Sequence, residues 1–257
     1  MPWRSSRSPY RVFVSEIMLQ QTSVAMVTPR YQAFLKSFPS FKALAAASVQ
    51  DVLKAWKGLG YNRRALALLQ SARIVTSVHH GRLPRTAEAL VQLPGVGPAT
   101  AAAVIVYAFN EPVPFIETNV RRVFIHFFFP GEDGVTDARI LPLVERTLDR
   151  ANPREWFYAL MDYGTFLAAQ SKPARRSGHG APEDALRRSS RYRRQAAFDG
   201  SHRQLRGRIL KAMLEKGRAR LPELQAALGR DPRMDAALRE LVDEGFLGLR
   251  GGTYSFR

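Results

Sequence analysis

The sequence of 257 residues contains no cysteine, which excludes disulfide bonds, thiolate metal sites and an iron–sulfur cluster held by cysteine ligands. No apolar run approaches 18 residues, and no charged and apolar leader stands at the start, so neither a membrane span nor a secretory signal is expected. Carboxylates are scarce, with 22 Asp and Glu against 39 Lys and Arg. These shortages exclude a disulfide scaffold and a membrane protein, and we expect an intracellular, cytoplasmic chain.

The net charge of +17 predicts attraction to a polyanion. Nucleic acid is favoured over a membrane surface, because no basic amphipathic helix carries a bulky aromatic face. A basic surface that serves only solubility is the alternative, and the local concentration of the charge argues against it.

Most of residues 11–170 show apolar side chains at helical spacing and little alternation with period two, which predicts an all-α core. Thr86 is a predicted N-cap for a short helix that ends before Pro94. Residues 127–129 are three consecutive Phe and are expected in the core. Further helices are predicted over residues 41–56, 63–80, 100–109, 137–150 and 154–169.

The last third of the chain divides into two parts. Residues 173–200 are rich in Arg, Gly and Ser, which predicts a mobile basic linker, and phosphate contact is favoured over a merely solvated spacer. The unit over residues 201–257 has the order of a winged helix, which serves either DNA binding or packing. Its helices are predicted over residues 202–216, 221–228 and 234–244, and its strands over 246–249 and 253–256.

Residues 93–97 read Leu-Pro-Gly-Val-Gly, which is typical of the tight turn of a helix–hairpin–helix. Gly95 and Gly97 would let the backbone pass close to a phosphate, and the N-terminus of the next helix would direct N–H groups at it. Leu93 and Val96 would anchor the turn in the core. A glycine-rich turn between packed helices is the alternative interpretation of this pentapeptide.

Three further segments extend the pattern, namely SEIMLQQT at residues 15–22, WKGLGY at 56–61 and ETNVRR at 117–122. Together with the hairpin they resemble the helix–hairpin–helix DNA glycosylase superfamily, which includes endonuclease III, and in particular its MutY-type adenine glycosylases. The resemblance covers residues 1–172. It implies the glycosylase fold, a role in base excision repair, and double-stranded DNA with a mismatch or lesion as the partner.

The resemblance also assigns catalytic roles. Glu117 takes the position of the family's catalytic Asp, whose carboxylate stabilises an oxocarbenium-like sugar. Glu16 takes the position of the acid that protonates the departing adenine, and its apolar neighbours would raise its pKa to suit that role. Asn119 matches an Asn that helps to organise the site. For Glu16 an ordinary helix carboxylate is the alternative.

Other matches concern DNA contact. Gln20 and Gln21 match glutamines that reach the DNA stack and the opposite base when a base is flipped out, although a polar helix end is the alternative. Tyr61 would stack on a base or fill the core after the glycine turn. Arg121 and Arg122 would contact phosphate or lie on a solvated helix face.

The sequence departs from the family pattern at several places. No cysteines follow residue 173, where the family carries its cluster, so the basic linker is a hypothetical replacement for a DNA-positioning loop. Ala99 stands where relatives with lyase activity have a Lys that attacks the sugar, so no AP-lyase activity is expected. Asn62 replaces a Tyr, and Glu117 is one methylene longer than Asp. The unit over residues 201–257 does not resemble the MutT-like domain that reads 8-oxoguanine.

The sequence therefore predicts a monomeric, MutY-like, monofunctional glycosylase without a cluster. It would flip a mispaired or damaged base, most of all adenine, out of duplex DNA in the nucleoid and hydrolyse its N-glycosidic bond. A uracil or thymine glycosylase acting on G mismatches and a non-catalytic DNA-binding protein are the alternatives. No metal or other cofactor is expected, except a structural monovalent cation at the hairpin.

Overall fold

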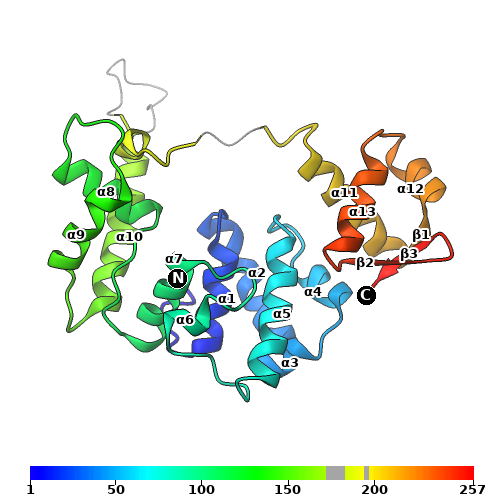
Figure 1. Cartoon of the computed structure of the whole chain (residues 1–257), viewed down its shortest axis with the longest axis horizontal. Coiled ribbons are helices and arrows are strands. Elements are labelled where there is room, and N and C mark those ends of the chain that lie inside the picture. Colours follow the sequence, from blue (N-terminus) through cyan, green and yellow to red (C-terminus); the bar gives the residue numbers. More distant parts are fainter. Residues whose placement is uncertain (172–182, 194–196) are drawn as a thin grey trace. The chain divides into compact units, whose positions relative to one another are not determined.

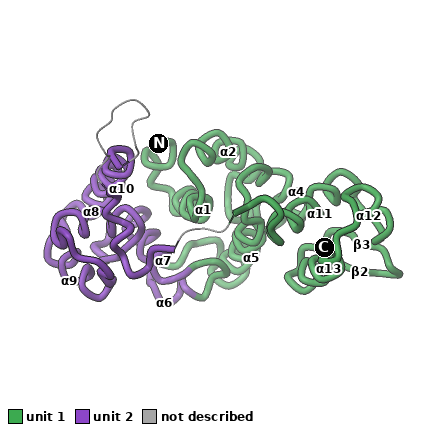
Figure 2. The backbone as a smooth tube through the Cα atoms, turned by 90° about the horizontal axis from the view of Figure 1, so that it is seen from above, with its two compact units in different colours: residues 1–84, 92–96, 195–257 green, residues 85–91, 97–194 purple. Residues whose placement is uncertain are grey.

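The structure of the chain is a computed structural model that describes residues 1–171, 183–193 and 197–257 (Figure 1). It divides into two compact units, which Figure 2 colours separately. Unit 1 comprises residues 1–84, 92–96 and 195–257, and unit 2 comprises residues 85–91 and 97–194. The fold is mainly helical, as predicted, and among the described residues no helix is long and apolar enough to cross a membrane.

Unit 1 opens with five helices around an aromatic core. They are α1 (Pro9–Leu19), α2 (Val24–Ser37), α3 (Phe41–Ala45), α4 (Val49–Ala55) and α5 (Arg63–Ser77). Phe34 and Trp56 are fully buried and meet edge to face, with 6.0 Å between ring centroids. The Trp56 indole N–H donates to the Gly60 carbonyl at 3.0 Å, so the same ring also fixes the turn between α4 and α5.

Unit 2 holds the remaining helices of the predicted all-α core. They are α6 (Ala87–Leu90), α7 (Pro98–Val104), the π-helix η1 (Ile105–Phe109), α8 (Thr118–Phe128), α9 (Asp137–Thr147), α10 (Pro153–Gln170) and the 3-10 helix η2 (Ala185–Arg188). Thr86 caps α6 as predicted, since its hydroxyl accepts the Ala89 N–H at 3.3 Å. Phe115 and Phe157 stack at 4.1 Å and join the loop before α8 to α10.

Helices α8 and α10 approach each other closely at Gly164 of α10. A Cβ at this position would lie 2.5 Å from the Asn119 Cβ and 2.9 Å from the Asn119 carbonyl oxygen. Distances this short have no room for a side chain, so the glycine is required by the backbone of α8 and not by its own torsion angles. The crossing therefore fixes the first turn of α8 against α10.

We expect Gly164→Ala to destabilise the folded chain by about 1–3 kcal/mol, because an extra methyl must displace α8 backbone. Gly207→Ala is the matched control, since Gly207 also lies inside a helix but has no atom within 4 Å of its Cβ position. The control is expected to be neutral or to stabilise by about 0.5–1 kcal/mol. Chemical denaturation of both variants measures the difference, and equal stabilities would contradict this account of the crossing.

The C-terminal part of unit 1 has the predicted winged-helix order with one additional strand. Its elements are α11 (His202–Lys216), β1 (Arg218–Arg220), α12 (Leu221–Leu228), α13 (Met234–Asp243), β2 (Leu247–Arg250) and β3 (Thr253–Phe256). The sheet has the order β1-β3-β2, and both pairings are antiparallel. Strand β1 was not predicted, because three residues between two helices are too few to show period-two alternation.

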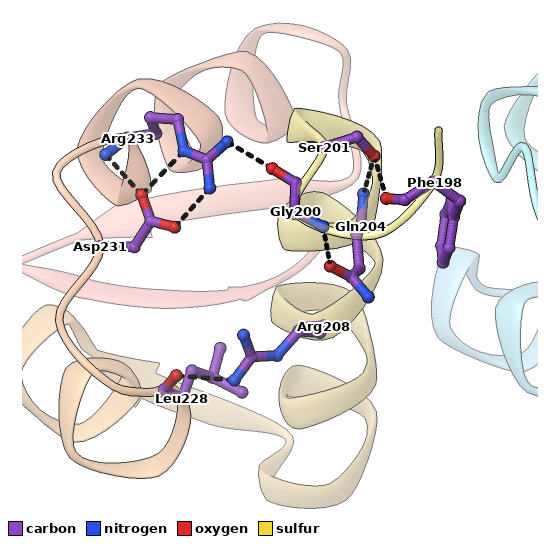
Figure 3. A network of polar contacts seen from close by, with 8 residues as sticks. All are labelled: Phe198, Gly200, Ser201, Gln204, Arg208, Leu228, Asp231 and Arg233. Carbon is purple, nitrogen blue, oxygen red and sulfur yellow. Dashed lines mark hydrogen bonds and ion pairs between the residues drawn. The ribbon is translucent and has the colours of Figure 1, made fainter. Parts of the chain in front are cut away.

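A network of polar contacts fixes the start of α11 (Figure 3). Ser201 caps the helix by accepting the Gln204 N–H at 3.2 Å, and the Gln204 side chain accepts the Gly200 N–H at 2.8 Å. Arg233 joins this turn to the start of α13, because it donates to the Gly200 carbonyl at 2.9 Å and pairs with Asp231 at 2.7 Å. The segment before α11 is thereby anchored to the rest of the winged-helix unit.

Residues 183–193 differ from the predicted mobile linker. The Val135 N–H donates to the Arg188 carbonyl at 2.9 Å, and the Ser190 N–H donates to the Val135 carbonyl at 3.0 Å. These bonds hold the segment against unit 2, because Val135 precedes α9. Its Arg-rich composition did not reveal this packing. Residues 173–182 and 194–196 of the predicted linker lie outside the described residues.

The three consecutive Phe at the end of α8 are not all in the core. Phe129 is buried, but Phe127 is 54% exposed and Phe128 is 47% exposed. Successive residues of a helix point in directions about 100° apart, so one packed face cannot bury all three. The expectation that the run lies in the core is therefore wrong for its first two members.

Candidate functional site

Glu117 stands at the N-cap of α8. Its Oε1 accepts the backbone N–H groups of Asn119 and Val120, the latter at 2.9 Å. Within the described part of the chain no donor reaches Oε2. The additional methylene relative to Asp therefore does not prevent capping, and one carboxylate oxygen is fixed at the positive end of a helix.

Opposing effects act on the pKa of Glu117. Burial raises it, and this effect outweighs the two backbone N–H donors and the charges of Arg121 and Arg122, which lower it. The net direction is a pKa above the ordinary value for a glutamate. A carboxylate in such surroundings gains more than an exposed one from a positive charge that develops beside it, because water screens the attraction less.

Arg121 and Arg122 follow on the same helix and are both paired inside unit 2. Arg121 pairs with Asp137 through two bonds of 2.7 and 2.9 Å. Arg122 is only 7% exposed and donates to the Asn119 Oδ1 at 2.6 Å. Neither side chain lies on a solvated helix face, and both guanidinium groups already have partners. Both guanidinium groups are therefore held by partners inside unit 2, and the expected phosphate contact stays a prediction.

Glu16 lies in α1 and belongs to unit 1. All residues from Val12 to Met18 are buried except Glu16, which is partly exposed. The apolar surroundings expected from the sequence are therefore present, and the carboxylate is the one accessible side chain in this stretch. A helix carboxylate placed in this way can reach a ligand without breaking the core.

The end of α1 is held by Arg64 of α5, a residue that the sequence analysis missed. Its Nη1 donates to the carbonyls of Ile17 at 3.1 Å and Met18 at 2.7 Å, which are among the last carbonyls of α1 and have no partner within the helix. Its Nη2 donates to the Thr22 hydroxyl at 2.8 Å and the Gly60 carbonyl at 3.2 Å. One buried guanidinium therefore joins the loop after α1 to the turn before α5.

The Arg64 side chain is buried, and burial lowers the pKa of Arg64 to about 10. The guanidinium still carries its charge at neutral pH. A signal for this role was present in the sequence, because Arg64 shares the spacing of the buried Leu68, Ser71 and Val75 in α5. A charged residue on the buried face of a helix must be paired.

The two loops that Arg64 joins carry predicted DNA-contacting residues in left-handed backbone conformations. Gln21 has a φ of 54° and Tyr61 has a φ of 47°. Non-glycine residues adopt such angles at a cost, and they cluster where function requires a fixed side-chain direction. Gln21 is exposed, whereas Gln20 donates from Nε2 to the Gly95 carbonyl at 3.1 Å and so contacts the hairpin turn.

The hairpin turn is anchored as predicted, and its two glycines differ. Leu93 and Val96 are buried. Gly95 has a φ of +77°, and a Cβ there would lie 2.9 Å from the Ala67 Cβ of α5. Gly97 has an ordinary φ of −88° and is the exposed N-cap of α7. Only Gly95 is therefore required by the turn itself.

The sequence of this chain matches a known protein family over about half of its length. Residues 14–144 match the family model described as HhH-GPD superfamily base excision DNA repair protein. The chain belongs to this superfamily. The matched span includes every residue to which the sequence assigned a catalytic role, namely Glu16, Glu117 and Asn119.

Members of the superfamily with similar sequences or structures support this assignment. An adenine DNA glycosylase of Mycolicibacterium smegmatis is 34% identical over 260 residues, which cover 96% of this chain and 87% of that protein. A thermostable thymine-DNA glycosylase has a TM-score of 0.59 and 29% identity, covering 67% of this chain and 81% of that one. An endonuclease III bound non-covalently to DNA has a TM-score of 0.53 at 20% identity and supports the fold alone.

The predicted site residues of this superfamily member fall in both units. Glu16, Gln20, Gln21, Tyr61 and Gly95 belong to unit 1, and Gly97, Glu117, Asn119, Arg121 and Arg122 belong to unit 2. The MutY-like resemblance and the helix–hairpin–helix glycosylase fold are confirmed. The roles of the individual residues stay predictions.

Proposed function

We propose that this protein is a monofunctional adenine DNA glycosylase that excises a mispaired adenine from duplex DNA. The observation that carries the proposal is the 34% identity to an adenine DNA glycosylase over 96% of the chain. The local geometry of Glu117 supports it, because a capped carboxylate with a raised pKa suits the stabilisation of positive charge. The net charge of +17 favours a polyanionic substrate.

In the proposed reaction the bond between C1′ of the sugar and the adenine nitrogen breaks, and its electron pair leaves with the base. Glu16 donates a proton to the departing purine, which makes it a better leaving group. Glu117 stabilises the positive charge that develops on the sugar. Water then adds to C1′ and releases a proton, which replaces the one that Glu16 gave up, so the products are adenine and an abasic site. Asn119 helps to order the groups around the sugar.

The proposal excludes strand cleavage through a covalent enzyme intermediate. Ala99 lies exposed in the first turn of α7 and offers only a methyl group, which cannot attack the sugar. We expect borohydride to trap no protein–DNA adduct on a duplex that the protein processes. Ala99→Lys provides the positive comparison, because it restores an amine at the same position. A trapped adduct with the wild-type chain would contradict a monofunctional mechanism.

A thymine or uracil glycosylase is the second candidate function. It is favoured by the likeness to a thymine-DNA glycosylase, which has a TM-score of 0.59 at 29% identity. The two candidates differ in the leaving group, because a purine offers an additional ring nitrogen for protonation. Glu16 therefore favours adenine, because the proposed acid can protonate the additional ring nitrogen that only a purine offers.

An excision assay on four duplexes separates the candidates: adenine opposite guanine, adenine opposite 8-oxoguanine, uracil opposite guanine and thymine opposite guanine. We expect cleavage of the adenine strands after alkaline treatment. Glu16→Gln should abolish adenine excision while duplex binding persists. Cleavage of the pyrimidine mispairs alone would overturn the adenine assignment, and binding with no abasic product from any duplex would favour a non-catalytic DNA-binding protein.

A further inference from the structure

Asp184, from the stretch predicted as a linker, makes a bidentate ion pair with a buried arginine of α8. Its carboxylate accepts from Arg122 Nε at 2.8 Å and from Arg122 Nη2 at 3.3 Å. The Leu186 N–H also donates to Asp184 Oδ1 at 3.0 Å, because Asp184 is the N-cap of η2. A backbone N–H of the same segment therefore orients the carboxylate that accepts from Arg122.

The remaining guanidinium nitrogen of Arg122, Nη1, contacts the first turn of α8. Nη1 donates to the Asn119 Oδ1 at 2.6 Å and to the Gly164 carbonyl of α10 at 3.2 Å. Nε, Nη1 and Nη2 each donate to an acceptor, and together these bonds fix the orientation of the guanidinium. Three elements meet at it: α8, α10 and the segment that begins at Asp184.

This arrangement determines which way the Asn119 amide faces. An arginine can only donate, so the amide oxygen must face Arg122 and the NH₂ group must face away. The Met161 sulfur, 3.8 Å from Nδ2, is a weak acceptor and leaves the NH₂ largely able to donate elsewhere. Asn119 is thus presented as a hydrogen-bond donor in the same helical turn whose N–H groups hold the Glu117 carboxylate.

We propose that Asp184 is a positioning residue for base excision, acting through Arg122 on Asn119 and hence on the turn that carries Glu117. The proposal rests on the glycosylase function proposed above. It assigns a role in the reaction to a residue 40 positions beyond the span matched by the family model, which ends at residue 144.

The other contacts of the segment make this role separable from simple anchoring. Arg191 pairs with Asp137 at 3.0 Å, and the backbone bonds of Val135 to Arg188 and Ser190 do not involve Asp184. Loss of the Asp184 charge should therefore leave the segment in place while freeing the orientation of Arg122. Arg191→Gln is the matched control, because it breaks an ion pair of the same segment that does not touch Asn119.

The test uses the full chain and the adenine mispair that the wild-type protein cleaves fastest, with enzyme in excess so that one turnover is observed. Asp184→Asn should lower the excision rate constant about 10- to 100-fold, since small misplacements of reacting groups have effects of this size. Its Kd for a duplex with a cleavage-resistant fluorinated adenine nucleotide should change less than about twofold. Asp184→Glu, which keeps the charge, should recover part of the rate, and Arg191→Gln should cleave at the wild-type rate.

A double-mutant cycle with Asn119→Ala tests the route. If Asp184 acts through Asn119, the double variant is no slower than Asn119→Ala alone. The proposal is overturned by a wild-type rate for Asp184→Asn, by an equal loss for Arg191→Gln, or by multiplicative effects in the cycle. If Asp184→Asn does not fold, Arg122→Lys replaces it, and a wild-type rate for that variant overturns the proposal. If the wild-type chain excises no base, the proposed function itself is refuted. That outcome is distinct from failure of the Asp184 proposal, which is judged by comparing the variants with an active wild type.

Discussion

Glu117→Gln should lower the single-turnover rate of base excision about 100- to 1000-fold while duplex binding remains intact. The carboxylate acts by its charge, and Gln has nearly the same size without it. The Gln side-chain oxygen can still accept the N–H groups of Asn119 and Val120, so the cap of α8 persists. Excision of adenine under enzyme excess, together with the Kd for a cleavage-resistant duplex, measures the two quantities separately.

The same substitution should not destabilise the protein at neutral pH. Burial raises the pKa of Glu117 in the folded state above its value in the unfolded chain, so stability is lost as the pH rises between these two values, and the full cost of the ionised carboxylate is present above the folded-state pKa. Removing the charge removes this cost, and the thermal midpoint of Glu117→Gln at pH 7 should equal or exceed that of the wild type. The difference should shrink as the pH falls, because the wild-type carboxyl then becomes neutral as well.

The proposed mechanism requires the ionised form of Glu117 in the wild-type enzyme. On the acidic side of the pH profile the excision rate should therefore rise with pH through a pKa above the ordinary glutamate value. A fully active Glu117→Gln protein would refute the proposed mechanism. An inactive variant that is also less stable at pH 7 would assign Glu117 to folding instead.

Arg64→Met should reduce the free energy of unfolding by about 3–5 kcal/mol, since it removes a buried guanidinium that donates to several groups and leaves their carbonyls without donors. Met fills the volume of the aliphatic part of Arg, so the loss reports the guanidinium contacts. Chemical denaturation gives the value directly. The end of α1 and the turn before α5 should also lose protection from hydrogen exchange, because Arg64 joins them.

Arg73→Met is the control for this prediction. Arg73 lies in the same helix and also donates to carbonyls, those of Ala45 and Ala47, but its side chain is exposed. Water replaces such bonds readily, so the expected loss is about 1 kcal/mol or less. Equal losses for the two arginine variants would show that burial does not distinguish them and would remove Arg64 from its assigned role.

Local patterns in the sequence determined much of the fold. The bounds of α11, α12 and β3 agree with those predicted, because each has a clear apolar stripe or a glycine boundary. Thr86 and the anchors of the hairpin turn were also predicted from side-chain chemistry that acts within a few residues. Glu117 was found by its place in a motif, and its capping geometry follows from a carboxylate at the start of a helix.

The supports of the candidate site could not be predicted in this way. Arg122 and Asp184 are 62 positions apart, and the composition around Asp184 indicated a solvated linker. Arg64 contacts the end of α1 across more than forty residues. The local sequence around a basic residue does not show whether its side chain is exposed or buried, because the groups that it contacts can lie far away in the sequence.

The sequence by itself thus determined the family, the helical core, the winged-helix order and the two glutamates that we propose for the chemistry. These features depend on residue type and short spacing, which are visible along the chain. Only the tertiary structure decided that Arg121 and Arg122 are internal ion-pair residues, that Asp184 pairs with Arg122 of α8, and that two of three consecutive Phe remain exposed. The physical reason is that burial and charge pairing are set by packing between distant segments.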